Sequence, residues 1–293
     1  MFKSEFVALV GSPNVGKSTL INALVGSKIA IVSKKPQTTR NRITGVLTME
    51  DSQIVFLDTP GIHAPKNKLG EYMVDVAQSA ARDVDVVLFI ADAKTGVRER
   101  DMEILEGLRG GAPVIVALNK IDAVDGERAD EVEQSVKQFA FPVIRISALH
   151  ALGLDALLDE LKKHLQEGPM FYPGDMVTDQ PQQLLVAELI REKALKNIGK
   201  EVPHGIGVEI EKMQYDETKK MYNIDAVIYT EKDSHKGIII GAGGSRLKKI
   251  ASGAREEIER MLDAKVFMQV WVKVKAGWRN KMSMLRALGY DQV

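Results

Sequence analysis

The residues best suited to chemistry lie near the start of the chain, in the stretch Gly11–Ser18, which reads G-x-x-x-x-G-K-S. An apolar run, FVALV, precedes it, and a helix-forming stretch follows it. In such a strand–loop–helix context the glycines let backbone N–H groups converge on phosphate oxygens, and the helix N-terminus adds partial positive charge. Lys17 can reach the outer phosphates, and the Ser18 hydroxyl can ligate Mg²⁺. The predicted phosphate-binding residues are Gly11, Ser12, Pro13, Asn14, Val15, Gly16, Lys17, Ser18 and Thr19.

Three later stretches favour a guanine nucleotide, and each follows a strand-like run. Asp58-Thr59-Pro60-Gly61 comes after IVFL, so Asp58 can hold Mg²⁺ through water and the Gly61 N–H can touch a terminal phosphate. Asp122 can accept the N1 and N2 protons of guanine, a donor pair that adenine lacks. The remaining predicted base-pocket residues are Asn119, Lys120, Ser147 and Ala148, where Ala148 offers a backbone N–H to the guanine oxygen. The carboxyl ends of parallel strands are where such sheets bind ligands.

In the second half, Gly241-Ala242-Gly243-Gly244 gives G-x-x-G after an apolar run, Ile238–Ile240, that we interpret as a strand or turn. A basic helix follows. Glycines there allow nucleic-acid backbone to approach the main chain, and the helix N-terminus favours anions. The surrounding region 236–281 has 11 basic and 4 acidic residues, although the whole chain is neutral. This stretch therefore predicts RNA binding, through Ile240, Gly241, Ala242, Gly243, Gly244, Ser245, Arg246, Lys248 and Lys249.

The elements that must position these residues change character near residue 170. The first half alternates β-branched runs with helical stretches, which predicts an α/β domain with a mostly parallel sheet and helices on both faces. A stretch rich in proline and glycine follows, and then the order α-β-β-α-α-β of a type II KH domain, ending in a short tail helix. We therefore expect a GTPase domain over 1–168, a linker over 169–181 and an α+β KH domain over 182–293.

These motifs resemble the TrmE-Era-EngA group of translation-factor-class P-loop GTPases over about the first 165 residues. The resemblance implies that Gln37–Arg40 is the switch I element and that Thr38 or Thr39 completes the Mg²⁺ shell; the sequence leaves that choice open. Lys17, Thr38, Thr39 and Gly61 are then the catalytic candidates. Metal ligands would be Ser18, Asp58 and one or both threonines.

Two positions bear on the hydrolysis rate. Ile62 stands where Ras-like proteins place a water-orienting glutamine, so we expect slow intrinsic hydrolysis. His63 is read as a switch II loop residue. Asn14 resembles the asparagine that related GTPases use to hold K⁺ beside the phosphates; an equally good interpretation is that Asn14 only shapes the loop.

A GTPase domain followed by a single KH domain resembles the Era family within that group, along essentially the whole chain. The resemblance implies a GTP/GDP switch that binds the 3′ end of 16S rRNA and assists assembly of the 30S ribosomal subunit. It further implies a cytoplasmic monomer with peripheral contact to the inner face of the cell membrane, although no amphipathic anchor is evident. Two alternatives stay open: a membrane-associated signalling or cell-cycle GTPase acting through protein partners, and an RNA-binding module whose nucleotide site is only structural.

Composition removes other classes of function. The chain has no cysteine, which excludes disulfide scaffolds, thiolate metal sites and cysteine nucleophiles. No secretory signal or long apolar span is evident in the 293 residues. Of the two tryptophans, Trp271 fits the alternation of a strand and is expected in the core, whereas the place of Trp278 is open.

Overall fold

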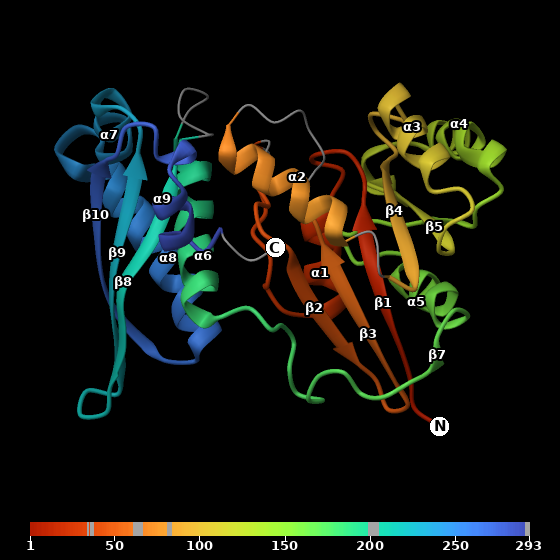
Figure 1. Cartoon of the computed structure of the whole chain (residues 1–293), viewed down its shortest axis with the longest axis horizontal. Coiled ribbons are helices and arrows are strands. Elements are labelled where there is room, and N and C mark those ends of the chain that lie inside the picture. Colours follow the sequence, from red (N-terminus) through yellow and green to blue (C-terminus); the bar gives the residue numbers. More distant parts are fainter. Residues whose placement is uncertain (34, 36–37, 61–66, 81–83, 199–204, 291–293) are drawn as a thin grey trace. The chain divides into compact units, whose positions relative to one another are not determined.

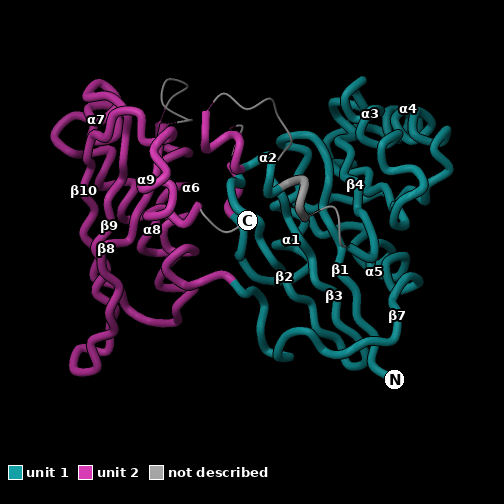
Figure 2. Tube along the Cα trace, in the orientation of Figure 1, with its two compact units in different colours: residues 1–30, 39–63, 73–179 teal, residues 31–38, 64–72, 180–293 magenta. Residues whose placement is uncertain are grey.

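The computed structural model of the chain describes residues 1–33, 35, 38–60, 67–80, 84–198 and 205–290 (Figure 1). It divides into two compact units, which Figure 2 colours separately. The first comprises residues 1–30, 39–63 and 73–179, and the second comprises 31–38, 64–72 and 180–293. Two short segments from the N-terminal half of the chain thus belong to the second unit.

The described part of the first unit contains a seven-stranded sheet in the order β2-β3-β1-β4-β5-β6, with β7 paired to β1. Pairing is parallel except for β2 with β3 and β7 with β1, so the sheet is mostly parallel, as predicted. Its strands are β1 (Lys3–Val10), β2 (Ile43–Thr48), β3 (Ser52–Asp58), β4 (Val86–Asp92), β5 (Val114–Asn119), β6 (Val143–Arg145) and β7 (Gln166–Glu167). Its helices are α1 (Lys17–Val25), α3 (Glu99–Gly107), η1 (Ile121–Ala123), α4 (Gly126–Val136), η2 (Lys137–Phe139) and α5 (Leu154–Lys162), and α2 (Lys68–Ala80) begins in the second unit.

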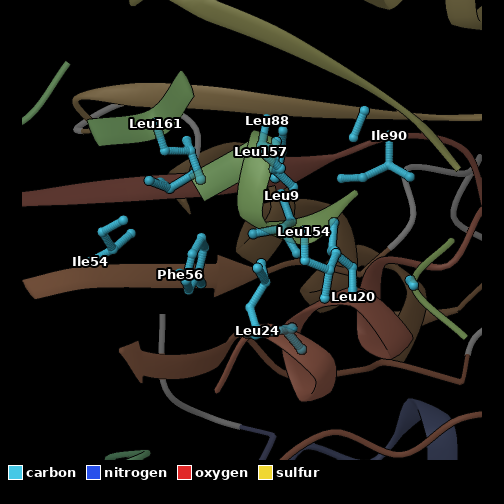
Figure 3. Close-up of a cluster of buried hydrophobic side chains, with 14 of the residues drawn as sticks. Leu9, Leu20, Leu24, Ile54, Phe56, Leu88, Ile90, Leu154, Leu157 and Leu161 are labelled. Carbon is cyan, nitrogen blue, oxygen red and sulfur yellow. The ribbon is translucent and has the colours of Figure 1, made fainter. Parts of the chain in front are cut away.

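The central strands are apolar on both faces because helices cover both. Strand β4, VVLFIAD, is buried throughout, which is typical of a parallel strand inside a doubly covered sheet. On one face, α1 and α5 pack their leucines against β1, β3 and β4, and Figure 3 shows this cluster around Leu9, Phe56 and Leu88. Leu157 and Leu161 of α5 are fully buried there, each contributing about 2 kcal/mol of transfer free energy. Helices α3 and α4 cover the other face.

The segment that joins the two sequence halves is bound to the first unit over residues 169–179. Gln53 of β3 holds it: its Oε1 accepts the Phe171 and Tyr172 N–H groups at 2.9 and 3.0 Å, and its Nε2 donates to the Tyr172 carbonyl at 2.9 Å. The ring of Phe171 lies 4.7 Å from that of Phe6. Gln53 is fully buried, so its amide is satisfied by this backbone and by the Thr48 hydroxyl, to which Nε2 also donates at 2.9 Å, rather than by water.

The second unit contains a three-stranded sheet in the order β10-β9-β8, with β8 and β9 antiparallel and β9 and β10 parallel. Helices α6, α7 and α8 pack on one face around Ile190, Ile228 and Ile258. The order α-β-β-α-α-β is the predicted one. Its elements are α6 (Gln182–Asn197), β8 (Gly207–Asp216), β9 (Met221–Thr230), α7 (Asp233–Ile240), η3 (Ala242–Gly244), α8 (Ser245–Leu262), β10 (Lys265–Val274), η4 (Trp278–Asn280) and α9 (Met282–Ala287).

Two local predictions for this unit are wrong. Ile238–Ile240 form the last turn of α7 rather than a strand, because Ile239 packs into the helical side of the core. Trp271 is 42% exposed, since β10 turns Val266 and Val272 inward and the alternate positions outward. Trp278, whose place was open, is fully buried, and its Nε1 donates to the Gly205 carbonyl at 3.1 Å.

Candidate functional site

The predicted phosphate loop joins β1 to α1 and has the backbone geometry that its glycines permit. Gly11 and Gly16 have φ of 150° and 112°. A Cβ at Gly16 would lie 2.2 Å from Asn119 Nδ2, and one at Gly11 would lie 2.5 Å from the Ile90 carbonyl oxygen. Both positions therefore need glycine. Lys17 is buried, and its Nζ donates to the Gly11 and Ser12 carbonyls at 2.8 and 3.2 Å, which holds the ammonium over the loop.

The Mg²⁺ candidates Ser18, Asp58 and Thr39 lie together in the first unit. Ser18 Oγ donates to Asp58 Oδ2 at 2.7 Å and lies 2.9 Å from Thr39 Oγ1. Asp58 Oδ1 is buried and has no hydrogen-bond partner among the described residues, so this oxygen-rich cluster fits a hard divalent cation. Thr38 is placed differently, because its Oγ1 donates to the Lys35 carbonyl at 2.6 Å.

Burial dominates the electrostatics of this cluster. It raises the pKa of Asp58, and the nearby Lys17 charge offsets part of that rise. It lowers the pKa of Lys17, against the opposing attraction of Asp58 and Asp101. A bound cation beside Asp58 and phosphates beside Lys17 would favour the charged form of each group. The site is therefore electrostatically matched to a metal–phosphate complex.

The base-pocket residues form one connected network at the ends of β5 and β6. Asn119 is 2% exposed; its Nδ2 donates to the Val15 carbonyl, and its Oδ1 accepts the Ala148 N–H, both at 2.9 Å. Ser147 Oγ donates to Asp122 Oδ1 at 2.5 Å and so orients that carboxylate. One asparagine thus ties the phosphate loop to the loop after β6, and Ser147 of that second loop holds Asp122.

Two acidic residues that sequence reasoning missed support these loops. Asp92, at the end of β4, accepts Lys120 Nζ at 2.6 Å, while Lys120 also donates to the Asn14 carbonyl at 2.8 Å. Asp101 of α3 accepts the Ser12 hydroxyl at 2.5 Å. The position of Asp92 directly after a strand was an available signal, whereas nothing in the spacing links Asp101 to Ser12.

The other predicted nucleotide residues flank this network. Thr59 is buried, and its Oγ1 donates to the Leu9 carbonyl at 3.2 Å, which anchors the start of the Asp58–Pro60 turn beside β1. Pro60 is also buried, and Thr19 lies in the first turn of α1. Gly61, Ile62 and His63 lie outside the described residues.

The predicted RNA-binding turn connects α7 to α8 in the second unit. Gly241, Gly243 and Gly244 have φ of 72°, 56° and 78°. A Cβ at Gly243 or Gly244 would meet no atom within 4 Å, so the outer side of the turn is open for an approaching phosphate. Ala242 and Ser245 are exposed around it, and Ile240 is half-buried beside it. The turn therefore leaves main-chain groups accessible at the start of an 18-residue helix.

The basic residues of this turn differ in their availability. Lys248 and Lys249 are exposed on α8, where they can meet a polyanion. Arg246 is half-buried, and its Nη1 donates to the Ile238 carbonyl at the end of α7. Its guanidinium thus helps to fix the two helices around the glycine turn, a role that its sequence position did not indicate.

The comparisons with known proteins agree with this geometry. Residues 6–120 match a family described as 50S ribosome-binding GTPase, and residues 201–279 match the KH domain family. The chain is 51% identical to GTPase Era of Alkaliphilus oremlandii, over 99% of each chain. It is 52% identical to GTPase Era of Clostridium perfringens, over 100% of each. The chain belongs to the Era family of GTPases.

Solved structures of Era proteins share the fold. One Era, in complex with MgGDPNP and nucleotides 1506–1542 of 16S ribosomal RNA, matches with a TM-score of 0.95 at 40% identity over 100% of each chain. Era of Aquifex aeolicus bound to GDP and AlF4⁻ matches with a TM-score of 0.94 at 40% identity. The match covers 99% of this chain and 100% of that one. The predicted family, the P-loop GTPase fold and the KH fold are confirmed. Among the described helices, none has the length and apolarity needed to cross a membrane.

Proposed function

We propose that this chain is a GTP-hydrolysing switch whose second unit binds the 3′ end region of 16S rRNA and which thereby assists assembly and maturation of the 30S subunit. The observation that carries the proposal is the pairing of two sites in one chain. One is a guanine-type network built on Asn119 and Asp122, and the other is an open glycine turn before a basic helix. The Era relative solved with 16S rRNA nucleotides supports the identity of the RNA.

Selection of guanine would rest on Asp122. Its Oδ1 accepts the Ser147 hydroxyl, and the carboxylate is about one-fifth exposed, so it can accept both guanine protons with little rearrangement. Adenine would leave that carboxylate unpaired, which costs about 1–3 kcal/mol or more for a charged group. The proposed nucleotide is therefore GTP or GDP rather than ATP.

In the hydrolysis reaction, Ser18, Thr39 and Asp58 would hold Mg²⁺, as the Era relative with MgGDPNP supports. The ion would supply positive charge to the phosphates. Lys17 would lie against the outer phosphates, and backbone N–H groups of the phosphate loop would fix their orientation. Between the two candidate threonines we choose Thr39, because the Thr38 hydroxyl is engaged by Lys35.

Two further proposals concern the rate of GTP hydrolysis. Ile62 cannot orient water by hydrogen bonding, so intrinsic hydrolysis would be slow. Asn14, whose φ is 66°, would hold K⁺ beside the phosphates and stabilise developing charge. Hydrolysis measured in KCl and in NaCl at equal ionic strength checks the second proposal. Equal rates of hydrolysis in the two salts would contradict a role for K⁺.

RNA binding is tested by a charge placed in the glycine turn. Gly243→Asp puts a carboxylate where a phosphate would approach. Gly243→Asn requires the same left-handed backbone at this position but carries no charge. Asparagine and aspartate both tolerate the left-handed region, so both variants should fold. With RNA copying the 3′ end of 16S rRNA, we expect Gly243→Asp to weaken binding at least tenfold more than Gly243→Asn, about 1.4 kcal/mol. Equal loss in the two variants, or no RNA binding by the unchanged chain, would contradict the proposal.

Partners and location follow from the same proposal. A chain that works on the 30S subunit would act in the cytoplasm as a monomer, with peripheral contact at the inner face of the cell membrane as a further expectation. The alternative, a signalling GTPase that acts through protein partners, predicts that charge reversal at Lys248 and Lys249 leaves function intact. Loss of RNA binding in that double variant, with GTP hydrolysis unchanged, supports the ribosomal role instead.

A further inference from the structure

Side chains from outside the phosphate loop hold the outer part of that loop in place. Lys120 and Asn119, both of the predicted base pocket, each donate to a carbonyl of the loop, at 2.8 and 2.9 Å. A further bond runs from the Ser12 hydroxyl to Asp101 Oδ1 at 2.5 Å. Asp101 lies in α3, a helix that supplies none of the predicted nucleotide residues, so this contact has no counterpart among the sequence motifs.

Asp101 is 6% exposed and uses its two carboxylate oxygens for different partners. Oδ2 accepts the N–H of Arg98, the residue that precedes α3, at 3.0 Å and so caps the start of the helix. Oδ1 accepts the Ser12 hydroxyl. Capping of the helix uses only the first of these oxygens. The carboxylate therefore also fastens the phosphate loop to the first turn of α3.

Ser12 is bound through its backbone as well as through its side chain. Its carbonyl accepts Lys17 Nζ at 3.2 Å, and the Gly11 carbonyl accepts the same ammonium at 2.8 Å. Fixing the Ser12 side chain therefore restricts where its carbonyl, and hence the ammonium, can lie. Burial lowers the pKa of Lys17 and the charges of Asp58 and Asp101 oppose that shift, so Asp101 also acts on Lys17 through space.

We propose that Asp101 is a positioning residue for GTP hydrolysis, which fixes the outer part of the phosphate loop through Ser12 and thereby the place of the Lys17 ammonium. The inference deepens the proposed function and rests on the role given there to Lys17. All three residues lie in the first unit. Donors that the protein holds in a fixed place need little reorganisation during the reaction, which is how they stabilise a transition state.

The charge of Asp101 and its bond to Ser12 affect nucleotide binding with opposite signs. The negative charge repels phosphates, so its removal strengthens the binding of GDP and GTP alike. The bond orders the loop, so its loss weakens that binding. The rate constant for bound GTP depends mainly on the bond, because the repulsion acts about equally on bound substrate and on the transition state. Loss of Asp101 should therefore reduce kcat more than it weakens GDP binding.

The test compares full-length variants. Asp101→Ala and Ser12→Ala remove the bond from either side, the double variant removes both partners, and Asp101→Asn retains a neutral hydrogen-bonding group. Asp125→Ala is the matched control. Asp125 Oδ1 caps α4 by accepting the Arg128 N–H at 2.9 Å, but no hydrogen bond joins Asp125 to a described residue of the phosphate loop. Readouts are kcat at saturating GTP and Mg²⁺, the affinity for GDP, and stability in urea.

We expect Asp101→Ala and Ser12→Ala each to lower kcat about tenfold, consistent with loss of one charged hydrogen bond, while GDP affinity stays within about threefold. The double variant should be no slower than Asp101→Ala, because both changes remove the same interaction. Asp101→Asn should recover part of the rate. Asp125→Ala should lose stability with kcat unchanged. Asp101→Ala that matches Asp125→Ala in kcat, that weakens GDP binding as much as it lowers kcat, or that adds fully to Ser12→Ala would overturn the inference.

Two further comparisons separate the possible failures. If Asp101→Ala does not fold, Ser12→Ala carries the test, because Ser12 is half-buried and makes no contact with the helix core through its hydroxyl. An unchanged kcat in folded Ser12→Ala would then overturn the inference. Lys17→Ala reports on the proposed function itself. If Lys17→Ala abolishes hydrolysis and the Asp101 and Ser12 variants leave it unchanged, only the role of Asp101 fails; if Lys17→Ala hydrolyses GTP at the unchanged rate, the proposed phosphate site fails.

Discussion

Replacing Asn119 with alanine should weaken guanine-nucleotide binding more than any other single loss of a neutral side chain in the site. This side chain joins two loops: its Nδ2 donates to the Val15 carbonyl and its Oδ1 accepts the Ala148 N–H, each at 2.9 Å. It is 2% exposed, so water cannot replace either bond without a rearrangement. The substitution leaves one buried acceptor and one buried donor unpaired.

The size of the effect follows from those two groups. Each unpaired buried group costs about 1–3 kcal/mol, so the free energy of unfolding should fall by about 2–6 kcal/mol. Nucleotide binding should become weaker by part of the same free energy, since the loops that carry Val15 and Ala148 must be ordered around the base. If about half of that free energy is lost from binding, GDP binding weakens by about 1–3 kcal/mol, which is roughly 5- to 150-fold in affinity.

Asn22→Ala provides the matched control. Asn22 also ties a loop together through its amide, donating to the Ala30 carbonyl at 2.8 Å and accepting the Ile29 and Ala30 N–H groups at 3.0 and 2.9 Å. Both variants should lose stability in chemical denaturation, and only Asn119→Ala should lose GDP affinity in a fluorescence titration. Equal losses of GDP affinity in the two variants would refute the view that Asn119 acts by joining the nucleotide loops.

Three other predictions follow from burial and charge. Burial, aided by Asp85, raises the pKa of Glu5 from 4.5 to about 8; folded Glu5 therefore keeps a proton that the unfolded chain releases above pH 4.5, and stability should fall as pH rises from 4.5 to 8. Glu5→Gln should flatten that part of the stability profile in denaturation at several pH values, and an unchanged slope would contradict the assignment. Trp278→Ala should lower the free energy of unfolding by about 3–5 kcal/mol, whereas Trp271→Ala, at an exposed position, should lower it by less than about 1 kcal/mol; similar losses in urea titrations would be inconsistent with the structure. Replacing Lys248 and Lys249 together with alanine should reduce the slope of log affinity against log salt by about 1.4 on single-stranded RNA, at about 0.7 per lost phosphate contact, while Lys219→Ala in the β8–β9 hairpin should leave that slope unchanged.

Spacing alone predicted that the candidate nucleotide residues lie together, because each stretch follows a strand and the carboxyl ends of parallel strands meet at one edge of the sheet. It could not choose between Thr38 and Thr39, since the choice depends on a bond from the Thr38 hydroxyl to the Lys35 carbonyl. Nor could spacing predict the hydrogen bond between Ser12 and Asp101, because these residues are 89 positions apart. Tertiary contacts of this kind leave no period in the sequence.

In the second unit, prediction from sequence failed for a different reason. Alternation predicted a strand around Trp271, but a period of two defines two faces without saying which one is covered. The packing of α6, α7 and α8 settles it, turning Val266 and Val272 inward and Trp271 outward.

If guanine nucleotide controls RNA binding, the affinity for RNA should differ between two nucleotide states, and measuring that difference is the most direct test. The full chain would be titrated against RNA copying the 3′ end of 16S rRNA at fixed salt, once with a non-hydrolysable GTP analogue and once with GDP. We predict affinities that differ by about fivefold or more, which is the lower end of typical coupling between two sites. Equally strong binding in both states would contradict the claim, even with RNA bound at the glycine turn.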